Sequence, residues 1–174
     1  MKGTYLDGAY RTTLQPGQYV TVHGGGLAGA AIRAFTHAPV AHAYVYVGRQ
    51  PSGHDMVEAQ PGGVRLGDIR SYDWATSFQS ETRFTPLQSA AITRTALACV
   101  GKPYGWLADM FIGMRQIRVP WVGGWMFKLH SVTSRMECAQ LADYCALANG
   151  VHYFNDGRQP GSVSPADLYH RDYK

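Results

Sequence analysis

The stretch His42-Ala43-Tyr44-Val45-Tyr46-Val47-Gly48 decides the fold class, because its β-branched and aromatic residues are typical of a central β-strand. Successive side chains of a strand point to opposite faces of its sheet. The strand is therefore predicted to carry small apolar side chains on one face and an imidazole with two phenols on the other: Ala43, Val45 and Val47 against His42, Tyr44 and Tyr46.

Turn residues divide the chain on either side of this strand into short elements. Gln15-Pro16-Gly17 precedes a predicted strand over 18–23, and an alanine-rich segment predicts a helix over 27–35. After the central strand, Pro51 and Gly53 indicate a hairpin loop over 49–54. The further strands are predicted over 56–59 and around 77–84.

Two later segments have apolar residues at helical spacing. The first covers 86–100 and ends at Gly101, and the second covers 136–149 and ends at Gly150. Ser134 with Glu137 three residues later has the pattern of a capping box at the start of the second helix. The predicted order is strand, helix, three strands, helix, a long connection and a helix.

Length and composition favour one domain over 1–174. The chain has 174 residues and 45% hydrophobic content, enough for one core and too little for two. The net charge of +4 is mild, and no run of Lys or Arg resembles a nucleic-acid-binding arm, so we expect no nucleic-acid partner. The oligomeric state has no signal in the sequence.

The amino-terminal and aromatic segments bear on location. Met1 to Tyr10 lacks the apolar core of a signal peptide, so we expect a cytoplasmic protein, or a released or virion-associated one if the chain is encoded by a phage. The segment 106–129 is rich in aromatic residues but is interrupted by charged residues and Pro120, so we expect no transmembrane segment.

Three cysteines occur, and their spacing excludes two classes of site. Cys99, Cys138 and Cys145 form neither an even disulfide framework nor a Cys-x-x-Cys metal pattern. Cys138 falls in the first turn of the last predicted helix, where unpaired backbone N–H groups and the helix dipole favour a thiolate. Cys138 is thus a candidate nucleophile, although a small buried hydrophobic role is the alternative. Cys99 and Cys145 are predicted to be structural.

The residues around Cys138 carry a resemblance to a known family. Glu137-Cys138-Ala139-Gln140-Leu141-Ala142-Asp143-Tyr144 resembles the nucleophile helix of NlpC-type papain-like hydrolases. Gly101-Lys102-Pro103-Tyr104-Gly105-Trp106 is similar to the family's Gly-x-Pro-Tyr stretch. His42 to Gly48 resembles the strand that carries its base, and Val57-Glu58-Ala59 falls where its third, orienting residue lies.

The order of these segments resembles a circularly permuted branch of the family. In the ordinary family the cysteine precedes the histidine, whereas here His42 precedes Cys138. Gln15-Pro16-Gly17 and Ser164-Pro165-Ala166-Asp167-Leu168-Tyr169 also resemble the permuted YiiX-like and lecithin-retinol-acyltransferase-like branch. The resemblance implies an α+β papain-like (NlpC/p60) fold, circularly permuted, with an antiparallel sheet or half-barrel packed against the nucleophile helix.

The resemblance also implies a catalytic site. Its members would be Cys138 as nucleophile, His42 as general base and Glu58 as the group that orients the base. His37, in a predicted loop, competes with His42, and Gln60 is the substitute for Glu58, since a slip of one residue in strand pairing would reverse the direction of Glu58.

Further expectations concern binding to this site. The backbone N–H of Cys138 is expected to contribute to an oxyanion hole. Tyr104 and Tyr44 are the candidate substrate-binding residues, and we expect no cofactor and no metal. Zinc binding by Cys138 and His42 is disfavoured, because no second closely spaced ligand pair accompanies them.

Three functions remain open on the sequence alone. The resemblance implies a thiol hydrolase, a peptidase or amidase that cleaves an amide or isopeptide bond, with peptidoglycan peptides as the first substrate to consider. The permuted branch also includes lipid-directed acyltransferases and thioesterases, and the aromatic segment 106–127 favours an apolar ligand. The third alternative is a binding module whose papain-like cleft is catalytically silent.

Overall fold

Five antiparallel strands form one sheet in the computed structural model, which describes residues 13–103 and 137–173. The strands are β1 (Tyr19–Val22), β2 (His42–Tyr46), β3 (Met56–Gln60), β4 (Gly63–Gly67) and β5 (Ser77–Gln79). They lie side by side in the order β4-β3-β2-β1-β5, so β2, the strand quoted first above, is central. Its predicted position in the fold is confirmed.

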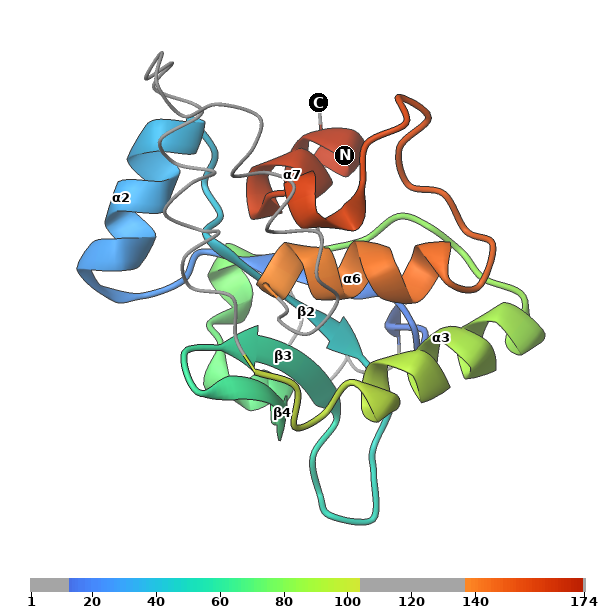
Figure 1. Cartoon of the computed structure of the whole chain (residues 1–174). Helices are drawn as coiled ribbons and strands as arrows, with labels where there is room; N and C mark the ends of the chain where they lie inside the picture. The colour runs from blue at the N-terminus through green and yellow to red at the C-terminus, as the bar shows by residue number, and fades with distance from the viewer. Residues whose placement is uncertain (1–12, 104–136, 174) are drawn as a thin grey trace.

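Four α-helices complete the described part of the chain. They are α2 (Gly26–Thr36), α3 (Pro86–Ala98), α6 (Cys138–Leu147) and α7 (Pro165–Tyr173). Figure 1 shows α6 lying across the sheet, where it packs against β2 and β3, with α3 beside it. This arrangement of helices on an antiparallel sheet confirms the predicted α+β class.

The alternation predicted for β2 is confirmed by the hydrophobic clusters that cover the two faces of the single sheet. Ala43, Val45 and Val47 belong to the helix-side core, which also contains Ile92 of α3 and Leu141 of α6. On the opposite face, Tyr44 and Tyr46 lie in a second core with Val20, Val22, Met56 and Ile69. Each face of the central strand is therefore buried by different partners, which fixes its register.

Several predicted boundaries are wrong. The strand predicted around 77–84 is shorter, since β5 ends at Gln79. Strand β4 and helix α7 were not predicted at all. The last predicted helix starts two residues later than 136, and its N-cap is Glu137 rather than Ser134; the Glu137 N–H donates to Gln140 Oε1 at 3.2 Å.

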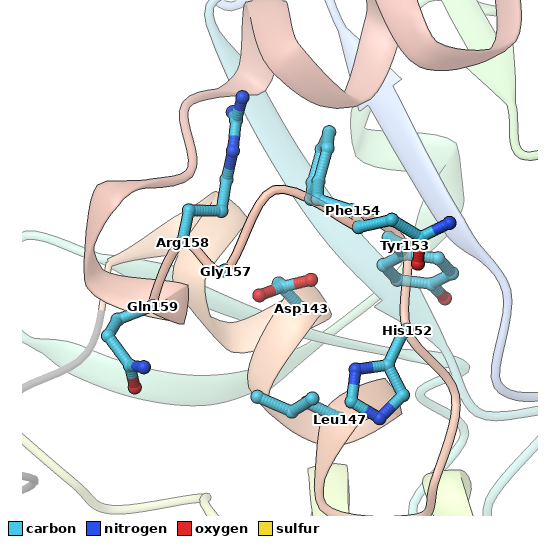
Figure 2. A pocket seen from close by; sticks show the side chains of 9 residues that line it. Asp143, Leu147, His152, Tyr153, Phe154, Gly157, Arg158 and Gln159 are labelled. Atoms are coloured by element: carbon cyan, nitrogen blue, oxygen red, sulfur yellow. The ribbon is translucent and has the colours of Figure 1, made fainter.

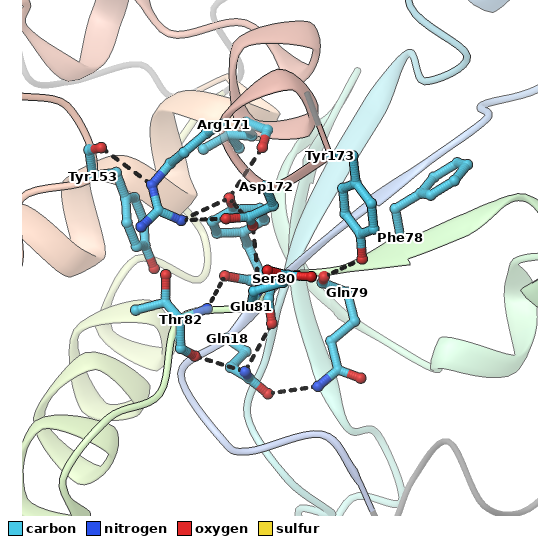
Figure 3. Close-up of polar contacts among 12 residues, drawn as sticks. Gln18, Phe78, Gln79, Ser80, Glu81, Thr82, Tyr153, Arg171, Asp172 and Tyr173 are labelled. Carbon is cyan, nitrogen blue, oxygen red and sulfur yellow. Dashed lines mark hydrogen bonds and ion pairs between the residues drawn. The ribbon is translucent and has the colours of Figure 1, made fainter. Parts of the chain in front are cut away.

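Helix α7 is fastened to the sheet by polar contacts that Figure 3 shows. The hydroxyl of Tyr19 on β1 donates to Asp172 Oδ2 at 2.6 Å, and that of Tyr173 donates to the Gln79 carbonyl at 2.5 Å. Arg171 Nε donates to the Tyr153 carbonyl at 3.1 Å. The two tyrosine bonds tie α7 to β1 and β5, and the Arg171 bond ties it to the segment that follows α6.

Two groups of predictions remain: those on residues that the structure does not describe, and the prediction that no segment crosses a membrane. Tyr104, Ser134 and the aromatic segment 106–129 lie outside the described ranges. Among the helices that the structure describes, none combines the length and the apolar character needed to cross a bilayer.

Candidate active site

His42 and Glu58 lie on neighbouring strands and on the same face of the sheet. Tyr44 pairs with Glu58 in the register of β2 and β3, so Glu58 is the diagonal neighbour of His42. The distance from His42 Nε2 to Glu58 Oε2 is 3.0 Å. The sequence alone left the pairing register of these two strands open. The observed register puts the Glu58 side chain on the same face as His42, beside the imidazole.

The Glu58 carboxylate is almost completely enclosed and is satisfied by four side chains. Its side chain is 2% exposed. Besides His42, the donors are the Tyr72 hydroxyl at 2.5 Å, Gln60 Nε2 at 2.8 Å and Arg65 Nε at 3.0 Å. A buried carboxylate with this many donors is held in one position, and its charge is compensated locally.

These contacts determine the ionisation of Glu58. Burial alone would raise its pKa, but the hydrogen bonds from His42 and Tyr72, the charge of His42 and the bond from Arg65 outweigh burial and lower the pKa to about 2. Glu58 is therefore ionised at neutral pH and accepts from every neighbour. Burial and the hydrogen bond to Glu58 raise the pKa of Tyr72, which stays protonated and donates.

An ionised Glu58 also fixes the tautomer of His42. Since Glu58 can only accept, Nε2 of His42 must carry the hydrogen, and the lone pair of the neutral imidazole is then on Nδ1. No residue in the described ranges is hydrogen-bonded to that Nδ1. His42 is thus prepared to accept a proton at Nδ1 while its other nitrogen stays anchored, and its side chain remains 13% exposed.

Tyr72, like Arg65, is a residue of this network that sequence reasoning missed. It follows the short 3-10 helix Ile69–Ser71, whose first N–H donates to Asp55 Oδ1 at 2.8 Å. The Tyr72 ring lies 5.6 Å, centroid to centroid, from the rings of both His42 and Tyr44. No motif in the sequence points to a tyrosine in this connection, because its role depends on how the chain returns after β4.

Cys138 is the first residue of α6, as predicted for a thiol in the first helical turn. It is 5% exposed and forms no disulfide bond. Figure 1 shows that β2 and α6 begin on the same side of the molecule, and α6 packs on β2. The charge of Cys138 also contributes to raising the pKa of Tyr72. Cys138 therefore lies within electrostatic reach of the group that holds Glu58.

Of the other predicted site residues, Gln60 and Tyr44 belong to the network around Glu58, and His37 ends a helix. Gln60, the substitute for Glu58, instead donates to Glu58 and to the Tyr72 hydroxyl, each at 2.8 Å. Tyr44 is fully buried, and its ring stacks on that of Tyr72, so it helps to hold Tyr72 in place. Its contact with substrate stays a prediction. His37 is the C-cap of α2, with a left-handed φ of 52°.

Two further features bear on the predicted chemistry: the positions of the other two thiols and the grouping of possible metal ligands. Cys99 and Cys145 lie in the helix-side core, as expected of structural cysteines. Among the residues that the structure describes, no three side chains of His, Cys, Asp or Glu are grouped closely enough to hold a metal ion.

Comparisons with known proteins support the fold. No protein-family model matches the sequence, and no curated protein matches it. The chain is similar in structure to the metalloprotein YiiX from Escherichia coli O157:H7, described as DUF1105, with a TM-score of 0.57 and 17% sequence identity. The alignment covers 90% of this chain and 81% of that one, so the chain has a YiiX-like α+β fold.

Proposed function

We propose that the protein is a thiol hydrolase on a circularly permuted papain-like scaffold, in which Cys138 is the nucleophile, His42 the general base and Glu58 the residue that orients the base. The observation that carries this proposal is the 3.0 Å contact between His42 Nε2 and an ionised Glu58, which leaves Nδ1 available for a thiol proton. The chain order supports the permutation, since β2 with His42 precedes α6 with Cys138.

The proposed reaction has two steps. His42 Nδ1 takes the proton of Cys138, and the thiolate attacks the carbonyl carbon of an amide, giving a tetrahedral oxyanion. The imidazolium returns this proton to the leaving nitrogen as the C–N bond breaks, which leaves a thioester on Cys138 and a free amine. Water then loses a proton to His42 and attacks the thioester, and the released thiolate is reprotonated from His42.

The network around Glu58 suits this cycle. The imidazolium formed in each step carries a positive charge beside a buried carboxylate that is already ionised, so no proton has to move to Glu58. The start of α6 supplies backbone N–H groups for the oxyanion, among which the N–H of Cys138 is the proposed donor. Bacterial wall peptides are the proposed substrates, because the resemblance of the Cys138 segment is to NlpC-type hydrolases.

Mass spectrometry of purified wall peptides after incubation with the full chain tests this proposal. We expect cleavage of an amide or isopeptide bond, loss of all turnover in Cys138→Ala, and normal turnover in the matched control Cys99→Ala, which removes a thiol from the helix-side core. Because the YiiX structure is described as that of a metalloprotein, the reaction is repeated with a chelator, which the thiol mechanism predicts to have no effect.

The same experiment separates the alternatives. Turnover of a fatty acyl ester in place of wall peptides, with the same dependence on Cys138, would move the proposal to a lipid-directed acyltransferase or thioesterase. Turnover of neither substrate, together with slow alkylation of Cys138, would contradict the enzyme proposal and favour a silent binding module.

A further inference from the structure

A second candidate site lies on another face of α6. A pocket of about 330 Å³ opens between α6 and the segment 152–159. Figure 2 shows Asp143 in the middle of its lining residues, with Arg158 and Phe154 on one side and His152 and Leu147 on the other. Asp143 is five residues after Cys138, about 140° further around an α-helix, so the two side chains leave α6 in different directions.

Asp143 is a buried carboxylate without a partner. The residue is only 5% exposed. No side chain or backbone group in the described ranges donates a hydrogen bond to it or forms an ion pair with it. Burial raises its pKa, and the attraction of Arg158, His152 and Arg171 opposes this rise without cancelling it. Since Asp143 lines the pocket, water or a ligand that enters there is what can pair with its carboxylate, and a cation would offset the cost of burial more than water does.

The nearest cation in the pocket is already paired with other carboxylates. Arg158 bonds to Asp156, with Nη2 to Oδ2 at 2.5 Å, and its Nη1 lies 3.0 Å from Asp167 Oδ1. Its guanidinium is also stacked over Phe154, 4.4 Å from the ring centroid. Arg171, the other guanidinium that acts on Asp143, is likewise paired, with its Nη1 2.7 Å from Asp172 Oδ1. Both guanidinium groups near the pocket are thus engaged by other carboxylates, which leaves the Asp143 carboxylate available to a cationic ligand.

We propose that this pocket binds a small ligand through a protonated primary amine, which donates to the Asp143 carboxylate while an attached alkyl chain lies against Leu147 and Phe154. Leu147 is one helical turn after Asp143 and forms an apolar wall beside the carboxylate. The volume is at the small end of ligand pockets and suits an alkylamine or an amino-acid side chain. The proposal does not depend on the hydrolase activity.

The first test uses pentylamine as the probe and pentanol as its neutral match. Backbone amide shifts are followed by NMR on the full chain at neutral pH, where the amine is protonated. We expect pentylamine to shift the amides of Asp143, Leu147 and Phe154 and to bind at least about tenfold more tightly than pentanol, as expected for a hydrogen bond to a charged group. In Asp143→Asn that preference should disappear.

A second pair of variants keeps the test informative if Asp143→Asn folds poorly. Leu147→Lys places an ammonium four residues after Asp143, so it should pair with that carboxylate, raise Tm by about 1–2 °C and abolish pentylamine binding. Leu147→Met keeps the wall apolar and should bind the probe as the parent does.

Four results would overturn the proposal. The first three are equal affinity for pentylamine and pentanol, unchanged binding in a folded Asp143→Asn, and full binding in Leu147→Lys. Magnesium chloride added alone is the last arm: the same Asp143-dependent shifts with Mg²⁺ would assign the pocket to a metal cation and contradict an amine site.

Discussion

Glu58 and Asp143 are two carboxylates that are nearly equally buried, at 2% and 5% exposure, and their surroundings differ completely. Glu58 lies on β3 and accepts from four side chains, whereas Asp143 lines a pocket and accepts no hydrogen bond from the described residues. Their pKa values move in opposite directions, downward for Glu58 and upward for Asp143. The number of hydrogen-bond donors, and not the exposed fraction, thus decides whether a buried carboxylate stabilises the fold or is left able to bind a ligand.

The largest expected effect is the loss of the Glu58 carboxylate. Glu58→Leu removes the acceptor of four donors and leaves two of them, His42 Nε2 and the Tyr72 hydroxyl, without an acceptor in a largely enclosed place. We therefore expect the free energy of unfolding to fall by about 3–5 kcal/mol. Asp143→Leu removes a charge that has no partner, so it should be neutral or stabilising by about 1 kcal/mol. Urea unfolding of both variants measures the difference, and equal destabilisation would remove the contrast between the two carboxylates.

Acid titration of stability should give opposite signs for the two sites. The pKa of Glu58 is lowered from 4.5 to about 2, so its stabilisation, on the order of 3 kcal/mol, is present above about pH 5 and is lost as pH falls through about 2. The pKa of Asp143 is raised, so its penalty is present at neutral pH and disappears on acidification.

The matched variants for this titration are Glu58→Gln and Asp143→Asn. At neutral pH we expect Glu58→Gln to be less stable than the parent and Asp143→Asn to be at least as stable, with both differences shrinking towards pH 2. A Glu58→Gln difference that does not change with pH would show that the carboxylate charge is not what stabilises this site.

A smaller effect is expected for the hydroxyl of Tyr72. Tyr72→Phe removes one hydrogen bond to an ionised group and leaves the Gln60 amide with one acceptor fewer, at a cost of about 1–3 kcal/mol in unfolding free energy. Tyr19→Phe is the matched control, since Tyr19 donates to Asp172 at 2.6 Å. Both should unfold more easily, but only Tyr72→Phe should slow alkylation of Cys138, and equal slowing would exclude a role for Tyr72 in positioning.

The smallest effect is expected for Arg65. Its Nε donates to Glu58 at 3.0 Å, but its side chain is 61% exposed, so water and salt screen the interaction. We expect Arg65→Ala to cost less than about 1 kcal/mol in thermal unfolding at moderate salt. A loss as large as that of Tyr72→Phe would show that the exposed side of the network contributes as much as its buried side.

Local patterns predicted the parts of the fold that depend on one segment. The alternation in His42 to Gly48 gave both faces of β2, and the spacing after Cys138 gave α6. Strand β4 escaped prediction because Gly63 and Gly67 frame it and its pairing depends on β3 and on Lys102, whose carbonyl accepts the Val64 N–H at 2.8 Å. Helix α7 did have a local signal, since Asp167 accepts from the Ser164 N–H at 2.8 Å as in a capping box.

The site itself needed three-dimensional information at two points. Only the register of β2 and β3 decides that Glu58 faces His42, and a hairpin longer or shorter by one residue would change that. Gly67 leaves room for the carboxylate, since a Cβ there would lie 3.3 Å from Glu58 Oε1, closer than ordinary van der Waals contact. Neither Tyr72 nor the unpartnered state of Asp143 has a signature in the sequence, because both depend on distant segments.

Alkylation of Cys138 across pH tests the central claim most directly. Iodoacetamide labelling of the full chain, followed by peptide mass spectrometry, compares the rates at Cys138, Cys99 and Cys145 in the parent and in Glu58→Gln. We predict that Cys138 reacts fastest at neutral pH, since a thiolate is the reacting form and His42 takes its proton, and that Glu58→Gln slows only this thiol. Equally slow labelling of all three thiols, or a Cys138 rate unaffected by Glu58→Gln, would contradict a thiol that His42 and Glu58 activate.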